Sequence, residues 1–116
     1  MRATIPLVFL LLLPPASGRA APGADQELDF GIDVARKGLW QEARFRFERA
    51  VELDPENASA LNDLAIALEQ QGDFVKAREN YEKALKLKPG SLYIQQNFDL
   101  FREADEKRNR KAKKKT

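Results

Sequence analysis

Residues 24–57 read ADQELDFGIDVARKGLWQEARFRFERAVELDPEN, and residues 58–91 read ASALNDLAIALEQQGDFVKARENYEKALKLKPGS. Ten aligned positions are identical at this spacing of 34 residues, whereas pairing at ordinary composition gives about two. A fixed period of this length indicates stacked supersecondary units rather than one globular core, and such units generally offer a surface for binding. The identical pairs are Ala24/Ala58, Asp29/Asp63, Ile32/Ile66, Gly38/Gly72, Ala43/Ala77, Arg44/Arg78, Glu48/Glu82, Ala50/Ala84, Leu53/Leu87 and Pro55/Pro89.

Both segments carry the periodicity of two amphipathic helices. Leu61, Leu64 and Leu68, for example, recur at spacings of three and four residues. Gly38 and Gly72 separate the two helical patterns of each segment, where a residue that tolerates positive φ ends a helix. No alternating strand pattern occurs, so the sequence predicts an all-α fold. The expected helices cover about 25–37, 40–53, 57–71 and 74–87, and a fifth begins near Leu92.

The two segments resemble the tetratricopeptide repeat, whose pattern is W-x₂-L-G-x₂-Y, then A-x₃-F, an alanine and a closing proline. This resemblance implies an α-solenoid of antiparallel helix hairpins. Gly31 and Ala65 stand where small residues let the two helices of a hairpin approach closely. Glu27 departs from the pattern, and we expect this polar residue to face water at the terminal unit. The slots hold Glu27, Phe30, Gly31, Val34, Ala43, Phe47, Ala50 and Pro55 in the first repeat, and Leu61, Leu64, Ala65, Leu68, Ala77, Tyr81, Ala84 and Pro89 in the second.

The repeats set the expected organisation of the chain. Of the first four pattern slots beyond residue 91, only Phe98 fits, and a polar outer face is what a terminal capping helix needs. The predicted parts are therefore a flexible leader over 21–24, repeat units over 25–57 and 58–91, a capping helix over 92–106 and a basic tail over 107–116, where order should fade. Two repeats are fewer than the three or more usually needed, so self-association or packing on a partner is expected to add stability.

The first 20 residues read as a secretory signal peptide. Arg2 supplies a positive charge, an apolar run covers 5–13, and two prolines end it before a stretch of small residues. Cleavage after Gly18 or after Ala20 fits equally well. A membrane anchor is the alternative, although the run is far shorter than the roughly 20 residues that span a bilayer. We therefore expect an exported protein, periplasmic or secreted.

Charge is distributed unevenly behind the formal net charge of +2. Residues 25–106 hold 18 acidic and 11 basic residues, a balance of −7, whereas residues 107–116 hold seven basic residues and no acid. The tail is interpreted either as a solubilising helix end or as an electrostatic tether for an anionic surface or polymer. No aromatic residues alternate with the basic ones, so base stacking is not supported, and nucleic acid is not an expected target of an exported chain. The basic residues are Lys107, Arg108, Arg110, Lys111, Lys113, Lys114 and Lys115.

Residues that commonly carry catalysis are missing from the chain. The sequence has no His and no Cys, which excludes Ser–His–Asp triads, cysteine nucleophiles and Cys/His zinc sites. No phosphate-binding glycine motif occurs either. The densest acidic group, over residues 25–33, is best interpreted as a solvated helix start rather than a metal site. Asn57-Ala58-Ser59 is a sequon whose use depends on the secretory pathway. We expect no enzyme, no metal and no cofactor.

The resemblance implies that the first helix of each pair lines a concave surface that binds an extended peptide or a helix of a partner. The alternative is that the apolar residues of this face merely complete the core. Amides there would bond an extended backbone, and carboxylates would favour a basic partner. None of these slots holds the Lys or Arg with which some relatives bind a C-terminal carboxylate. The three slots hold Ile32, Ile66 and Leu100; Leu28, Asn62 and Gln96; and Asp29, Asp63 and Asn97.

Overall fold

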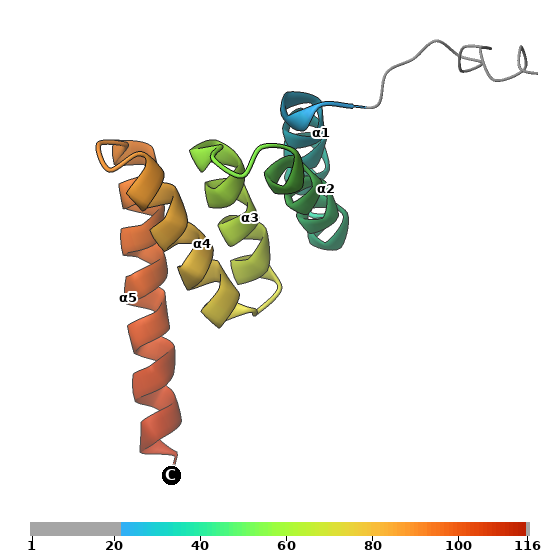
Figure 1. Ribbon diagram of the computed structural model, residues 1–116. Helices are drawn as coiled ribbons and strands as arrows, with labels where there is room; N and C mark the ends of the chain where they lie inside the picture. Colours follow the sequence, from blue (N-terminus) through green and yellow to red (C-terminus); the bar gives the residue numbers. More distant parts are fainter. Residues whose placement is uncertain (1–21, 116) are drawn as a thin grey trace, which may run out of the picture.

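The computed structural model describes residues 22–115, which form five α-helices and no strand (Figure 1). This confirms the all-α prediction, and the first four helices match their expected bounds to within one residue. The predicted signal peptide and Ala21 lie outside the described residues. The helices are α1 (Ala24–Arg36), α2 (Trp40–Leu53), α3 (Ala58–Gln70), α4 (Phe74–Leu87) and α5 (Leu92–Lys114).

The helices stack as two hairpins and a terminal helix. α1 packs on α2 and α3 packs on α4, while α2 against α3 and α4 against α5 join the units into a solenoid (Figure 1). Gly38 and Gly72 turn the chain within each hairpin with φ angles of 78° and 83°, a region that favours glycine because it has no Cβ. At the start of α3, the Asn57 side chain accepts a hydrogen bond from the Ala60 backbone N–H at 3.0 Å.

Equivalent residues of the two repeats occupy equivalent places in the larger of two buried clusters. Phe47 and Tyr81 are 2% and 1% exposed and belong to the same buried cluster. Tyr81 lies with its ring centroid 5.7 Å from that of Phe98 and 5.4 Å from that of Phe101, so α5 closes the core of the second hairpin. Each hairpin therefore buries its apolar face against the next element.

The fifth helix continues to Lys114, beyond the end predicted at residue 106. Figure 1 shows its last turns extending past the other helices. No Pro or Gly interrupts residues 92–115, and Lys, Arg and Ala favour helix. Tertiary contacts add to this, because the Arg108 guanidinium carbon lies 3.5 Å from the centroid of the Phe74 ring on α4. The basic residues as far as Lys114 thus belong to a helix rather than to a fading tail.

Glu27 does not face water, so the expectation that this polar residue of the terminal unit is exposed was wrong. The residue is 4% exposed, and its carboxylate lies 3.3 Å from Nη1 of Arg46 on α2. The long Arg46 side chain on the neighbouring helix reaches the buried carboxylate. The ion pair thus occupies the position that Leu61 occupies in the second repeat. Among the helices of residues 22–115, none is both long and apolar enough to cross a membrane.

Candidate partner-binding groove

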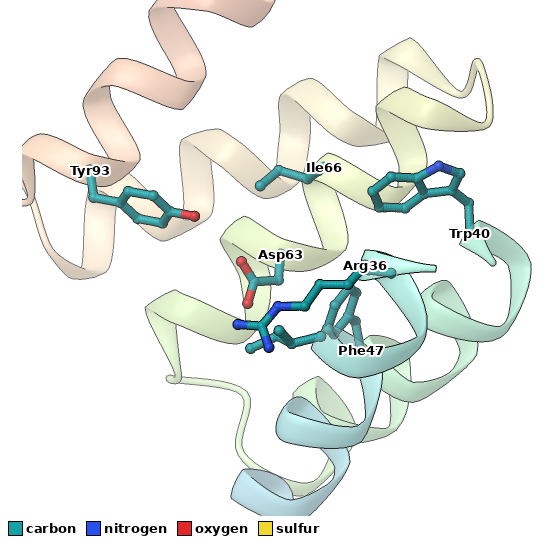
Figure 2. A pocket seen from close by; sticks show the side chains of 8 residues that line it. Arg36, Trp40, Phe47, Asp63, Ile66 and Tyr93 are labelled. Carbon is teal, nitrogen blue, oxygen red and sulfur yellow. The ribbon is translucent and has the colours of Figure 1, made fainter. Parts of the chain in front are cut away.

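A groove of about 400 Å³ opens on one face of the solenoid (Figure 2). Side chains from α1, α2, α3 and α5 line it, so it crosses both repeats and reaches the terminal helix. Most of its lining is apolar, with one carboxylate, one guanidinium and one phenol among the walls. The lining residues are Ile32, Ala35, Arg36, Trp40, Phe47, Asp63, Ile66 and Tyr93.

The 34-residue period explains why this groove forms. α1, α3 and α5 are successive first helices, and α3 contacts both of the others. Ile32 and Ile66 occupy the same position in their repeats, so stacking places both on one wall. Both residues are partly buried and also pack against the core cluster. Each of these two residues packs against the core and also borders the groove, so the groove interpretation and the core interpretation do not exclude each other.

Asp63 is the one carboxyl group among the lining residues of the groove, and its pKa is raised. Burial raises its pKa to about 6, while a hydrogen bond donated by the Asn62 side chain at 3.1 Å opposes the shift. Asn62 is fully buried and in turn accepts a hydrogen bond from Asn97 Nδ2 at 3.2 Å. A chain of amide and carboxyl groups thus links α5 to α3, and it holds the Asp63 side chain in place at the groove wall.

Arg36 brings a positive charge to the groove, although none of the three predicted sets of equivalent positions contains a basic residue. Its guanidinium lies 3.8 Å from the Asp33 carboxylate, and both side chains are more than 70% exposed. Such an exposed pair contributes little to stability, and the arginine stands at the groove rim. Figure 2 shows the Arg36 side chain extending toward the Asp63 carboxylate, although the two groups do not form an ion pair.

The structure brings together only part of the predicted site. Ile32, Asp63 and Ile66 line the groove. Leu100 is 66% exposed and Gln96 is exposed, but neither borders this groove, and Asp29 is exposed on α1. Leu28 is partly buried and packs against the core, while Asn62 and Asn97 supply the hydrogen-bonded chain behind the groove.

Five lining residues were not predicted, and helical spacing could have identified three of them. Ala35 and Arg36 follow Ile32 by three and four residues, and Tyr93 precedes Asn97 by four. Trp40 and Phe47 come from α2, a second helix of a pair, and only the packed hairpin shows that they reach the concave side.

The chemistry available in this groove is that of recognition. It offers apolar walls, a carboxylate that accepts hydrogen bonds, and aromatic rings. Over residues 22–115, no group of three or more acidic side chains is arranged to hold a metal ion.

Of the predicted tail residues, Lys107 and Arg108 pair with Glu103 and Asp105 at 3.4 and 3.1 Å. Arg110, Lys111, Lys114 and Lys115 are exposed on α5 or at its end, and Lys113 is exposed there as well.

Comparisons with known proteins agree with the helical repeat. A family model described as tetratricopeptide repeat matches residues 28–91. Protein O-mannosyl-transferase TMTC1 of Mus musculus is 37% identical over 79 residues, which is 66% of this chain but 8% of that protein. The probable UDP-N-acetylglucosamine–peptide N-acetylglucosaminyltransferases SPINDLY of Petunia hybrida and Solanum lycopersicum are 39% and 46% identical over 59 residues, 51% of this chain and 6% of theirs. The chain thus spans less than a tenth of these relatives.

Proposed function

Because this chain belongs to the tetratricopeptide repeat family, in which protein–protein interaction is the usual role, we propose that it is a non-catalytic interaction module. It binds an extended peptide or a helix of a protein partner in the groove defined above. The observation that carries this proposal is the position of Ile32 and Ile66, which are equivalent in the two repeats and share one open, largely apolar groove.

The dimensions and chemistry of the groove support a peptide rather than a reactive substrate. Trp40 and Tyr93 border it from different helices, and aromatic side chains supply large contact areas at protein interfaces. The chain has no His or Cys to act as base or nucleophile. The transferase names of the relatives belong to proteins of which this chain matches 6–8%, so they support no enzymatic assignment here.

Selection of random 12-residue peptides displayed on phage against the full chain tests the proposal, and a matched pair of variants locates the site. Tyr93→Ala removes a groove wall, whereas Leu92→Ala removes a neighbouring side chain that is 76% exposed and does not line the groove. We expect Tyr93→Ala to weaken the selected peptides about tenfold, as truncation of an interface aromatic commonly does, and Leu92→Ala to leave binding unchanged.

A third variant separates the groove from the basic end of the chain. Deletion of residues 107–116 should leave groove binding intact, and raising the salt concentration should change it little. If binding were lost on this deletion, fell steeply with salt and survived Tyr93→Ala, the groove would not be the binding site. The electrostatic tether would then explain the binding.

We also propose that the chain is exported after removal of its first 18 or 20 residues. The support is the order of charged, apolar and small residues in this segment. The mass of the protein recovered outside the cytoplasm of a secreting host should correspond to a chain that begins at Arg19 or Ala21. Recovery of the uncleaved chain in the membrane fraction would favour the anchor instead.

A further inference from the structure

The groove contains a carboxyl group that lacks a cation. Asp63 accepts one hydrogen bond, from Asn62, and forms no ion pair within residues 22–115. The arginine that lines the groove, Arg36, pairs with Asp33 instead. Burial of an ionised carboxylate without a cation is unfavourable, so this site holds a charge that a ligand can stabilise.

We propose that the groove recognises a partner segment through a Lys or Arg side chain, whose charged group pairs with Asp63 and whose aliphatic stem lies against Ile32, Ile66 and Tyr93. This inference rests on the proposed function and names the chemistry of its partner. Long basic side chains combine an apolar stem with a charged end. The apolar walls of the groove can contact the stem of such a side chain, and its one carboxylate can pair with the charged end.

Charge around the groove favours a basic partner over an acidic one. Asp25, Asp29 and Asp33 are exposed on α1, the helix that forms one wall. Residues 25–106 carry 18 acidic and 11 basic residues, a balance of −7, and the seven basic residues of 107–115 lie toward the opposite end of α5 from the groove residue Tyr93. Such a field attracts a basic segment before contact and disfavours an acidic one. Arg36 opposes this field at one rim, but its exposed pair with Asp33 leaves it free to turn away.

The environment of Asp63 makes pH a test of the pairing. Burial raises the pKa of its carboxyl group to about 6. The groups that face it are Arg36 from α1, Tyr81 from α4 and Tyr93 from α5, while Trp40 and Phe47 from α2 do not titrate. Binding of a cation favours the ionised form, so the affinity for a basic peptide should rise as pH increases through 6. Burial and a hydrogen bond to Glu69 raise the pKa of the Tyr81 phenol, so this group stays protonated over this range.

The probe is the set of groove-binding peptides selected from the random phage library with the full chain. We expect Lys or Arg at one position in most of them. Replacement of that residue by norleucine, which keeps the stem and removes the charge, should weaken binding about tenfold in fluorescence anisotropy at pH 7.5. Asp63→Asn should abolish this difference, because the variant keeps the acceptor for Asn62 and loses the charge. Glu79→Gln, which neutralises an exposed carboxylate on α4 outside the groove, is the matched control.

Measurements at pH 5 and pH 7.5 complete the test. The wild type should bind the basic peptide several-fold more tightly at pH 7.5, and Asp63→Asn should show no such change. If Tyr93→Ala weakens the peptides while Asp63→Asn retains the preference for Lys or Arg, the inference is overturned and the groove function stands. If no selected peptide depends on Tyr93, the groove function itself fails.

A second copy of the chain could also occupy the groove, because its basic C-terminal end is complementary in charge to Asp63. A peptide of residues 105–116 should not compete with the selected peptides, and light scattering should give the mass of a monomer. Competition by that peptide, together with a concentration-dependent mass, would assign the groove to self-association and overturn the inference of a separate basic partner.

Discussion

Nη1 of Arg46 lies 3.3 Å from the carboxylate of Glu27, which is 4% exposed although it stands where the repeat pattern expects an aromatic residue. The same guanidinium lies 4.3 Å from the centroid of the Phe30 ring and its Nε lies 3.1 Å from Glu42. At this position of the first hairpin, Arg46 thus pairs with Glu27 and stacks on Phe30. The second hairpin closes the same position with Leu61, which is 3% exposed.

Arg46→Ala is predicted to destabilise the fold, because it leaves the Glu27 carboxylate buried without its cation. A buried charge left without its partner costs about 2 kcal/mol or more, so thermal unfolding should begin at a clearly lower temperature. The double substitution Glu27→Leu with Arg46→Asn copies the pair Leu61 and Asn80 of the second repeat. It should restore stability to the wild-type value or above it, since buried ion pairs are often replaceable by apolar residues. A double variant as unstable as the single one would show that the pair itself is required.

Gly31→Ala is predicted to destabilise the protein by about 1–2 kcal/mol in urea unfolding. A Cβ at this position would lie 2.7 Å from Cδ1 of Phe47 and closer still to Cε1, and 3.2 Å from Cβ of Arg46. The Phe47 ring is 2% exposed and packs within the core cluster, so a shift of the ring disturbs its core contacts. Helix propensity favours alanine by about 1 kcal/mol, so a stabilised variant would mean that the ring does yield.

The reverse substitution in the second repeat is the control for this prediction. Ala65 is fully buried at the equivalent position of α3, where a Cβ is already accommodated. Ala65→Gly should therefore cost about 1 kcal/mol through helix propensity and the lost methyl group, without relief of any clash.

Helix boundaries were predictable from this sequence because local chemistry decides them. Gly38 and Gly72 end helices by their positive φ angles, and the 34-residue period alone placed Ile32 and Ile66 on one wall. Contacts between helices were not predictable in the same way. Whether Arg46 reaches Glu27, or Asn97 reaches Asn62, depends on side-chain directions across two helices. Trp40 was missed for this reason, whereas the helical spacing of Tyr93 from Asn97 could have identified Tyr93.

Asp63→Asn is predicted to stabilise the protein at pH 7 while it weakens binding of basic peptides. The folded-state pKa of Asp63 is raised to about 6, so between about pH 4 and pH 6 the folded state binds more protons than the unfolded state. Stability of the wild type should therefore fall as pH rises through this window, then remain level above it. The variant has no such loss and should gain about 1–2 kcal/mol at pH 7, where the wild type keeps a buried charge.

Urea unfolding of both proteins at pH 4 and pH 7 measures this effect. The quantity compared is the stability gained by Asp63→Asn at pH 7 minus the stability it gains at pH 4. Asp99 and Asp105 have lowered pKa values through hydrogen bonds with Gln95 and Arg78 respectively, so both proteins lose stability together in more acidic solution. Equal gains for the variant at the two pH values would contradict the assignment to Asp63.

The terminal turns of α5 should depend on Arg108. Its guanidinium stacks on Phe74 at 3.5 Å, and Asp105 accepts hydrogen bonds from Arg108 and from Arg78 at 3.1 and 3.0 Å. Arg108→Ala is predicted to cost about 1 kcal/mol through loss of a cation–π contact and of a partly buried ion pair. For a domain of this size the Tm should fall by roughly 5 °C.

Amide hydrogen exchange locates the same effect along the chain. Residues 105–114 should exchange faster in Arg108→Ala than in the wild type, while the core of α3 should be unchanged. Arg110→Ala is the control, because Arg110 is exposed on the same helix and has no ring beneath it within the described residues. Equal effects of the two substitutions would mean that helix propensity, and not the contact with Phe74, holds these turns.

Trp40 provides an intrinsic reporter of groove occupancy. It is the only tryptophan of the chain, it is partly buried and it lines the groove. A bound peptide removes water from the indole, so the emission maximum should shift to shorter wavelength in proportion to occupancy, at the affinity measured by anisotropy. Trp40→Phe, which copies Phe74 of the second repeat, should remove the signal and keep most of the binding. A ligand that fills a cavity of about 400 Å³ must change the solvent contact of the residues that line it. Peptides that bind without any change in Trp40 emission would therefore bind elsewhere, and the groove would not be their site.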